Sequence, residues 1–256
     1  MSADPFVDDL DKDLSWRKKE ISDLYIICQS NDHEILAKSL LLIIYSHWEG
    51  FIKNSSKLYL QYVSNLDIKM GDLTYNYKTI SIKGLISECI KSTDTLTLEN
   101  ELRFIKKYTE KNETKFKIKD NVSTDRDKSL INTQDNLSPK VFFNICKIVG
   151  LPEKESIRTK TNFLDEFMLG HRNAISHGNK INFDSDCEFT FSLNDISQLK
   201  NIILEIMMQF KEDLCEYAIQ EYYFHSNDVN KLKYDLKSDT NLHERLESIL
   251  EDNVVN

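Results

Sequence analysis

The chain has 256 residues, of which 40% are hydrophobic and 29% are charged, and its formal net charge is −9 at pH 7. This acidic balance argues against a protein that coats nucleic acid through bulk electrostatics, so any contact with RNA or DNA must be local. Only six glycines and three prolines occur, which favours long helices over a β-sandwich or a barrel. We therefore expect an all-α protein.

The cysteines and the apolar runs favour a cytoplasmic protein. Five cysteines are scattered along the chain, with no Cys-x-x-Cys pair and no cysteine–histidine cluster at zinc spacing, so we expect a reducing compartment, no metal and no cofactor. The N-terminus is acidic, and the longest strongly apolar run, residues 40–45, is too short to span a bilayer. We expect neither a signal peptide nor a membrane helix.

Helical spacing of apolar residues predicts the first elements. Residues 10–28 form an amphipathic pattern, and residues 35–63 form a second helix that is apolar over more than half its circumference near its start. A helix of this kind is typical of the centre of a bundle.

The periodicity weakens between residues 64 and 137. Shorter helices are predicted over 80–91 and 98–108, and the alternation at 115–119, with residues 130–131 beyond a polar turn, predicts a small β-hairpin insertion at about residues 110–137. Residues 103–119 carry seven basic and two acidic side chains. Either they form a solvated charged face, or they steer RNA through the weak candidates Lys106, Lys107, Lys115 and Lys117.

Capping residues mark the later helices. Ser138-Pro139 and Gly150 bound a helix over 141–149, and Gly178 is placed as a left-handed C-cap of a helix over 162–177. Residues 187–191 alternate like a short strand. Asn194 or Asp195 then caps a long helix to about residue 224, and a last helix follows in the tail.

Residues 169–178, LGHRNAISHG, are the one place where the sequence suggests chemistry. Arginine holds a phosphate through its forked guanidinium, and histidine is the side chain best suited to moving protons near neutral pH, so Arg172 and His177 together indicate work on a phosphodiester. Five positions separate them, about 140° of arc on a straight helix. Because they do not share a face, Arg172 must reach around the helix or a second subunit must complete the site.

In this sequence, residues 172–178 (RNAISHG) resemble the Arg-polar-x3-His motif of the HEPN superfamily (higher eukaryotes and prokaryotes nucleotide-binding domains). Residues 45–53 (YSHWEGFIK), 136–139 (NLSP) and 191–196 (FSLNDI) add to the resemblance. Their order is similar to that of a bacterial HEPN subfamily from defence and toxin–antitoxin contexts. The similarity covers roughly residues 30–224, so we expect a HEPN-like helical domain at 1–224 and a C-terminal helical extension at 225–256.

The resemblance implies a helical bundle that dimerises so that the motif helices meet. It also implies a metal-independent endoribonuclease with a composite site, a toxin or antiviral defence effector restrained by an antitoxin or other regulatory protein. In that reaction a ribose 2′-hydroxyl attacks the adjacent phosphorus, which leaves a 2′,3′-cyclic phosphate and a 5′-hydroxyl. His177 would act as general base or acid and Arg172 would stabilise phosphorane charge, while Asn173 would orient the imidazole or bind phosphate.

Each of these residues also has a structural interpretation. Arg172 could be a surface ion-pair partner and His177 a helix cap, and His171 is best interpreted as a packing or surface histidine. Glu49 and His47 are candidate supporting residues. Glu49 fits a buried polar contact, for example with Arg172, better than catalysis, and His47 also fits a structural role.

Two other functions compete with the ribonuclease. A HEPN-like module could bind a nucleotide, an RNA or a partner protein without cleaving anything, and a helical scaffold would explain the charge and the amphipathic helices. Retention of both Arg172 and His177 favours the enzyme, because a pure binder has no need for a proton-transfer group.

Overall fold

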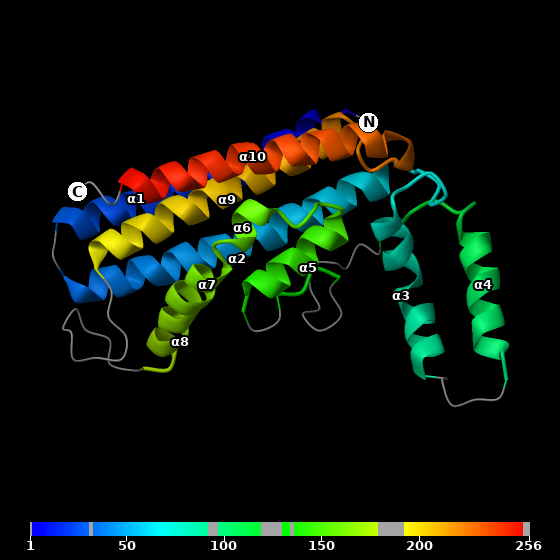
Figure 1. The fold of residues 1–256 in the computed structure, drawn as a ribbon, viewed down its shortest axis with the longest axis horizontal. Helices are drawn as coiled ribbons and strands as arrows, with labels where there is room; N and C mark the ends of the chain where they lie inside the picture. The colour runs from blue at the N-terminus through cyan, green and yellow to red at the C-terminus, as the bar shows by residue number, and fades with distance from the viewer. Residues whose placement is uncertain are drawn as a thin grey trace.

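The computed structural model describes residues 2–30, 33–91, 97–118, 130–133, 136–178 and 192–252. The fold over these residues is all-α, as expected. No strand is found among them, and their extended pairing is limited to two isolated bridges, Lys69 with Lys115 and Leu73 with Phe224. Long helices lie alongside one another, and shorter helices are attached to them (Figure 1). The long helices are α1 (Asp4–Ser30), α2 (Glu34–Asn65), α9 (Leu193–Ile219) and α10 (Asp228–Asp252).

Helix α2 is the central helix of the bundle. It packs against α1, α9, α5 and α8, and its apolar side chains are buried along most of its length. By length and composition it is the one described helix that could cross a membrane, but half of its most apolar stretch is buried inside the protein. Its hydrophobicity is therefore accounted for by packing against other helices.

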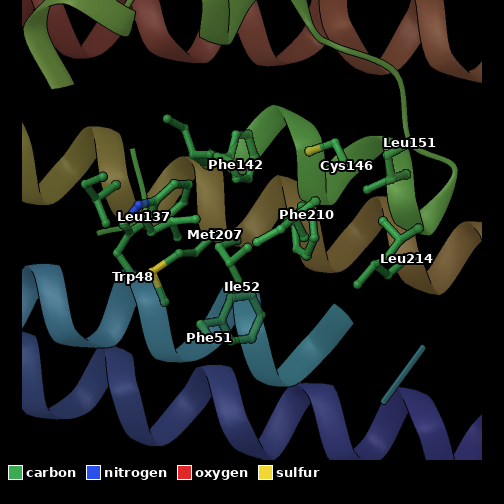
Figure 2. Close-up of a cluster of buried hydrophobic side chains, with 14 of the residues drawn as sticks. Trp48, Phe51, Ile52, Leu137, Phe142, Cys146, Leu151, Met207, Phe210 and Leu214 are labelled. Atoms are coloured by element: carbon green, nitrogen blue, oxygen red, sulfur yellow. The ribbon is translucent and has the colours of Figure 1, made fainter. Parts of the chain in front are cut away.

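Aromatic side chains fix α5 (Pro139–Val149) against the bundle (Figure 2). The Phe142 ring lies 5.0 Å from that of Trp48 on α2 and 5.8 Å from that of Phe210 on α9, measured between centroids. All three side chains are buried. Because burial of one phenylalanine is worth about 1.5–3 kcal/mol, this cluster also fixes the segment that leads into α5.

The predicted boundary residues of α5 are confirmed. The Ser138 hydroxyl accepts a hydrogen bond from the Val141 N–H at 3.3 Å, Pro139 lies in the first turn, and Gly150 has a left-handed φ of 87°. The helix begins at Pro139, two residues earlier than predicted.

Helices α3 (Tyr75–Lys91) and α4 (Glu99–Lys111) form an arm at one end of α2 (Figure 1). The predicted hairpin is not found within the described residues, because Lys115 pairs with Lys69 rather than with residues 130–131. The reason is the neighbouring Phe116, which is fully buried with its ring centroid 5.0 Å from that of Tyr77 on α3. The turn of that hairpin, at residues 119–129, lies outside the described residues.

Helix α9 begins with a capping box. The Ser192 hydroxyl accepts from the Asp195 N–H at 3.1 Å, and the Asp195 carboxylate accepts from the Ser192 N–H at 2.7 Å. The prediction of Asn194 or Asp195 as the cap was wrong, because Asp195 is the third helical residue of the box and not its start. The helix ends at Ile219, and the strand predicted at 187–191 lies outside the described residues.

Helix α10, which was predicted as an extension, packs along α9 and onto α6 (Glu155–Arg158). A buried ion pair joins these elements: Lys154 Nζ lies 3.2 Å from Asp213 Oδ2, and it donates a hydrogen bond to Ser238 Oγ on α10 at 2.6 Å. Leu242 and Leu246 are fully buried on the same helix. Residues 228–252 therefore share the packed core of the bundle.

Candidate functional site at helix α8

The motif lies at the end of a helical stretch that was predicted to be one regular helix. The stretch consists of α7 (Thr161–Phe163), a π-helical segment η2 (Leu164–Leu169) and α8 (Gly170–Ser176). A π segment widens the helix and changes the direction in which the following side chains point, and such segments are frequent at functional sites. Here it ends directly before α8, which contacts α2.

Arg172 and Asn173 are half-buried and in contact with each other. Arg172 donates a hydrogen bond from Nη1 to Asn173 Oδ1 at 2.9 Å. Asn136, in the segment before α5, lies with its amide nitrogen 3.4 Å from the same oxygen. The Asn173 side chain therefore binds Arg172 and Asn136. It does not orient the His177 imidazole, contrary to the prediction.

Tyr45 of α2 forms the surface against which Arg172 rests. The Arg172 guanidinium carbon lies 4.9 Å from the centre of the Tyr45 ring, which is cation–π distance. The phenol oxygen accepts from the Leu137 N–H at 2.8 Å. Burial raises the pKa of this phenol well above its usual value, and the neighbouring Glu49 carboxylate raises it further, so Tyr45 is neutral throughout the physiological range.

Glu49 lies one turn after Tyr45 on α2. Its Oε1 accepts a hydrogen bond from Thr133 Oγ1 at 2.5 Å. The ion pair with Arg172 that the sequence suggested is not found among the described contacts: Arg172 donates to Asn173 instead, and Thr133 binds one oxygen of Glu49. Glu49 and Arg172 both act electrostatically on Tyr45, in opposite directions.

His177 is exposed and is the C-cap of α8. Its backbone N–H donates to the Asn173 carbonyl at 2.9 Å, and Gly178 follows with a left-handed φ of 73°, as predicted. No described residue hydrogen-bonds to its imidazole. Arg172 is thus held against α2, whereas the His177 side chain is open to solvent at the end of the same helix.

The other two histidines near these motifs have packing roles. His171 is buried, with its Nδ1 2.6 Å from the Phe167 carbonyl oxygen and its ring on Phe167. His47 is buried on the side of α2 that faces α1, where its Nε2 lies 3.0 Å from Glu20 Oε2 and its Nδ1 3.5 Å from Arg17 Nη1. It is therefore not part of the cluster around Arg172, and its candidacy as a supporting residue has no geometric basis.

The basic candidates lie beyond the C-terminal end of α2, away from the motif. Lys115 and Lys117 both pair with Asp67, and Lys117 also donates to the Ser64 carbonyl. Ser64 is 15 residues beyond Glu49 on α2, which is about 22 Å along the helix. Lys106 and Lys107 are exposed on α4, in the projecting arm. Sequence proximity of these lysines to one another thus did not translate into proximity to the motif.

A family model, HEPN_MAE_28990-like HEPN, matches residues 6–223. The chain belongs to the HEPN family. This membership indicates a function that involves nucleotides or RNA. No curated protein and no solved structure matches the chain. The region matched by the HEPN family model ends just before α10, so α10, which packs on α9, lies outside the matched region.

Sequence reasoning gave no role to three residues that contact the motif of this HEPN domain or its neighbour Glu49: Tyr45, Thr133 and Asn136. One signal for Tyr45 was available, because it lies four residues before Glu49 and so on the same helix face. The contacts of Thr133 and Asn136 depend on how the chain folds back before α5, which no local pattern encodes. Among the described residues, no group of three His, Cys, Asp or Glu side chains is placed to hold a metal ion.

Proposed function

We propose that this HEPN protein is a metal-independent endoribonuclease whose active site is completed by a second copy of the chain. The observation that carries the proposal is the arrangement of the motif: Arg172 is fixed by Asn173 and Tyr45, whereas His177 is exposed at the end of the same helix. A fixed guanidinium suits an anion-binding role, and an exposed imidazole suits proton transfer with a substrate that arrives from outside.

The reaction is an internal transesterification of RNA. The ribose 2′-oxygen forms a bond to the adjacent phosphorus as its proton passes to one imidazole, and the bond from phosphorus to the 5′-oxygen breaks as that oxygen takes a proton from a second imidazole. The products are a 2′,3′-cyclic phosphate and a 5′-hydroxyl. His177 and its counterpart in the second copy take the two proton-transfer roles, each worth about 10²–10⁴ in rate. Arg172 stabilises the charge on the phosphorane oxygens.

The exposure of His177 supports a composite site. One histidine cannot give and take a proton in the same step, and the described residues next to His177 offer no second acid or base in contact with it. Two α8 ends that meet across a dimer supply both histidines. Arg172, five residues before His177 on the same helix, supplies the guanidinium.

The second candidate is a HEPN module that binds RNA or nucleotides without cleaving them. Arg172 on Tyr45 would serve such a binder equally well. Retention of a solvent-exposed histidine at the end of α8 favours the enzyme, since binding does not require a proton-transfer group.

Cleavage of total RNA in the presence of EDTA tests the proposal. We expect the wild-type protein to cut RNA, and Arg172→Ala and His177→Ala to lose activity. Arg103→Ala on α4 and His243→Ala on α10 are matched controls, because both replace exposed side chains that pair with surface carboxylates away from α8. Loss of activity in the controls as well, or activity unchanged in both motif variants, would contradict the proposal, and so would a protein that is strictly monomeric in solution.

The biological setting follows from the same chemistry. We propose that the protein acts in the cytoplasm as a toxin or antiviral defence effector. An unregulated ribonuclease would injure its own cell, so the proposal includes a partner protein that restrains it. Toxicity on expression that His177→Ala relieves would support this setting.

A further inference from the structure

A polar groove lies between α5 and the stretch from α6 to η2. Its volume is about 480 Å³. It is lined by residues of both segments: Pro139, Lys140, Phe143, Asn144, Lys147, Glu153, Arg158, Thr161 and Asp165. We call it the α5 groove. Three of these side chains are cationic and two are anionic, so the groove is locally positive on a chain whose net charge is −9.

The α5 side of the groove carries an ordered row of polar side chains. Lys140, Asn144 and Lys147 are spaced i, i+4 and i+7, which places them on one face of the helix. The row is about 10 Å long from Lys140 to Lys147, at 1.5 Å per residue. Lys140 is exposed and has no ion-pair partner among the described acidic side chains.

One carboxylate, that of Glu153, stands between a cation of α5 and a cation of α6. Glu153 Oε1 lies 2.6 Å from Lys147 Nζ, and Glu153 Oε2 lies 3.1 Å from an Arg158 guanidinium nitrogen. The hydrogen bond from Lys147 lowers the pKa of Glu153, so the carboxylate is charged. Two oxygens that bridge a lysine and an arginine occupy the same geometry that two phosphate oxygens would take.

The groove begins beside the motif. The segment that enters α5 contacts the motif cluster through Asn136, whose amide reaches Asn173, and through Leu137, whose N–H binds Tyr45. Pro139 and Lys140 come next and line the groove. On the opposite wall, Asp165 lies on η2, seven residues before Arg172 and about 10 Å along the helix. A strand bound at Arg172 could thus continue directly into the groove.

We propose that the α5 groove binds the single-stranded RNA that flanks the scissile phosphodiester, an inference that rests on the proposed ribonuclease function. Lys140, Lys147 and Arg158 hold backbone phosphates, with Glu153 displaced from the last two. Asn144, Thr161 and Asp165 offer amide, hydroxyl and carboxylate groups to base edges.

The chemistry of the lining favours a single strand over a duplex. A duplex presents mainly phosphates and 2′-hydroxyls, whereas an unpaired strand presents the hydrogen-bonding edges of its bases as well. Carboxylates such as Asp165 repel phosphates but accept hydrogen bonds from the amino groups of bases. A mixed lining of this kind therefore suits exposed bases alternating with phosphates.

Binding of a 2′-O-methyl RNA oligonucleotide tests the groove separately from cleavage, because a strand without 2′-hydroxyls cannot undergo the proposed reaction. In fluorescence anisotropy at 0.1 M salt, we expect the double variant Lys140→Ala/Lys147→Ala to weaken binding by about fivefold for one lost phosphate contact and about 25-fold for two. The slope of log affinity against log salt should fall by about 0.7–1.4.

The matched control is Lys106→Ala/Lys107→Ala on α4, which removes the same charge from another exposed helix. We expect it to bind RNA as the wild type does. A third variant has the opposite sign: Glu153→Gln frees two cations and should tighten binding by up to about fivefold. Circular dichroism confirms that each variant is folded.

The proposal is overturned if the α4 variant weakens binding as much as the α5 variant does, or if Glu153→Gln weakens it. It is also overturned if a duplex RNA competes as well as the single strand. Failure of the wild type to bind the strand at 50 mM salt would overturn it too, and would mean that the groove serves another partner. Binding that depends on the groove in a protein that cuts no RNA would support the groove and contradict only the ribonuclease.

Discussion

Replacement of Tyr45 by phenylalanine removes the contacts of its hydroxyl with Leu137 and Asn136 and keeps the contact of its ring with Arg172. The phenol oxygen is the acceptor for the buried Leu137 N–H at 2.8 Å. A buried donor left without a partner costs about 1–3 kcal/mol. For a chain of this size each kcal/mol lowers the melting temperature by about 2–4 °C. We expect Tyr45→Phe to melt roughly 2–12 °C lower than the wild type and to keep its kcat, since the ring beneath Arg172 remains.

Tyr45→Leu removes the ring as well as the hydroxyl. The cation–π contact with Arg172 is worth about 0.5–2 kcal/mol, more when it is desolvated, and without it the guanidinium loses its support. We expect a further loss of stability of that order and a fall in kcat that Tyr45→Phe does not show. Differential scanning calorimetry and single-turnover cleavage measure the two effects. Equal kcat in the two variants, or an unchanged melting temperature in Tyr45→Phe, would refute this reasoning.

Three further predictions concern the fold. Burial lowers the pKa of His47 below its unfolded value of 6.5, so the unfolded chain binds the proton first as the pH falls. The free energy of unfolding should therefore decrease as the pH drops below about 6.5. Thermal scans of His47→Gln should show a weaker pH dependence than those of the wild type. Lys154→Met leaves the buried Asp213 carboxylate without its ion-pair partner, so urea unfolding should show a loss of about 3–5 kcal/mol in the free energy of unfolding. Adding Asp213→Asn should restore part of that loss. Losses that simply add in the double variant would contradict the pairing. Ser192→Ala removes the cap of α9 and should cost about 0.5–2 kcal/mol in the same assay.

The elements that the sequence predicted well are those specified by local signals. Ser138, Pro139 and Gly150 bound α5 as expected, and Gly178 is left-handed directly after the motif helix. The central position of α2 followed from an apolar pattern over most of its circumference. Each of these features depends on residues close in the chain, which is why periodicity and capping rules can find them.

The site was predicted only in part, because its contacts are between distant segments. Arg172 was named as one possible partner of Glu49, but it rests on Tyr45, one turn away on α2, while Thr133 binds the Glu49 carboxylate. His47 lies beside Glu49 in sequence but faces α1, since residues two apart on a helix point in nearly opposite directions.

Two other differences have the same origin. The alternation around Phe116 was interpreted as a hairpin strand, but the apolar position is needed to cover α3. The lysines of that region were considered for RNA binding because they are dense in sequence. The cations that line the α5 groove come from α5 and α6 and are brought together by folding.

The chemistry of the new RNA ends shows whether the protein cleaves RNA by attack of the 2′-hydroxyl. Total RNA is incubated with the wild-type protein in EDTA, and mass spectrometry identifies any new termini. We expect 2′,3′-cyclic phosphates paired with 5′-hydroxyls, absent with Arg172→Ala and with His177→Ala, and no cleavage of a 2′-O-methyl strand. Products with 3′-hydroxyl and 5′-phosphate ends, or cleavage of the 2′-O-methyl strand, would contradict this mechanism.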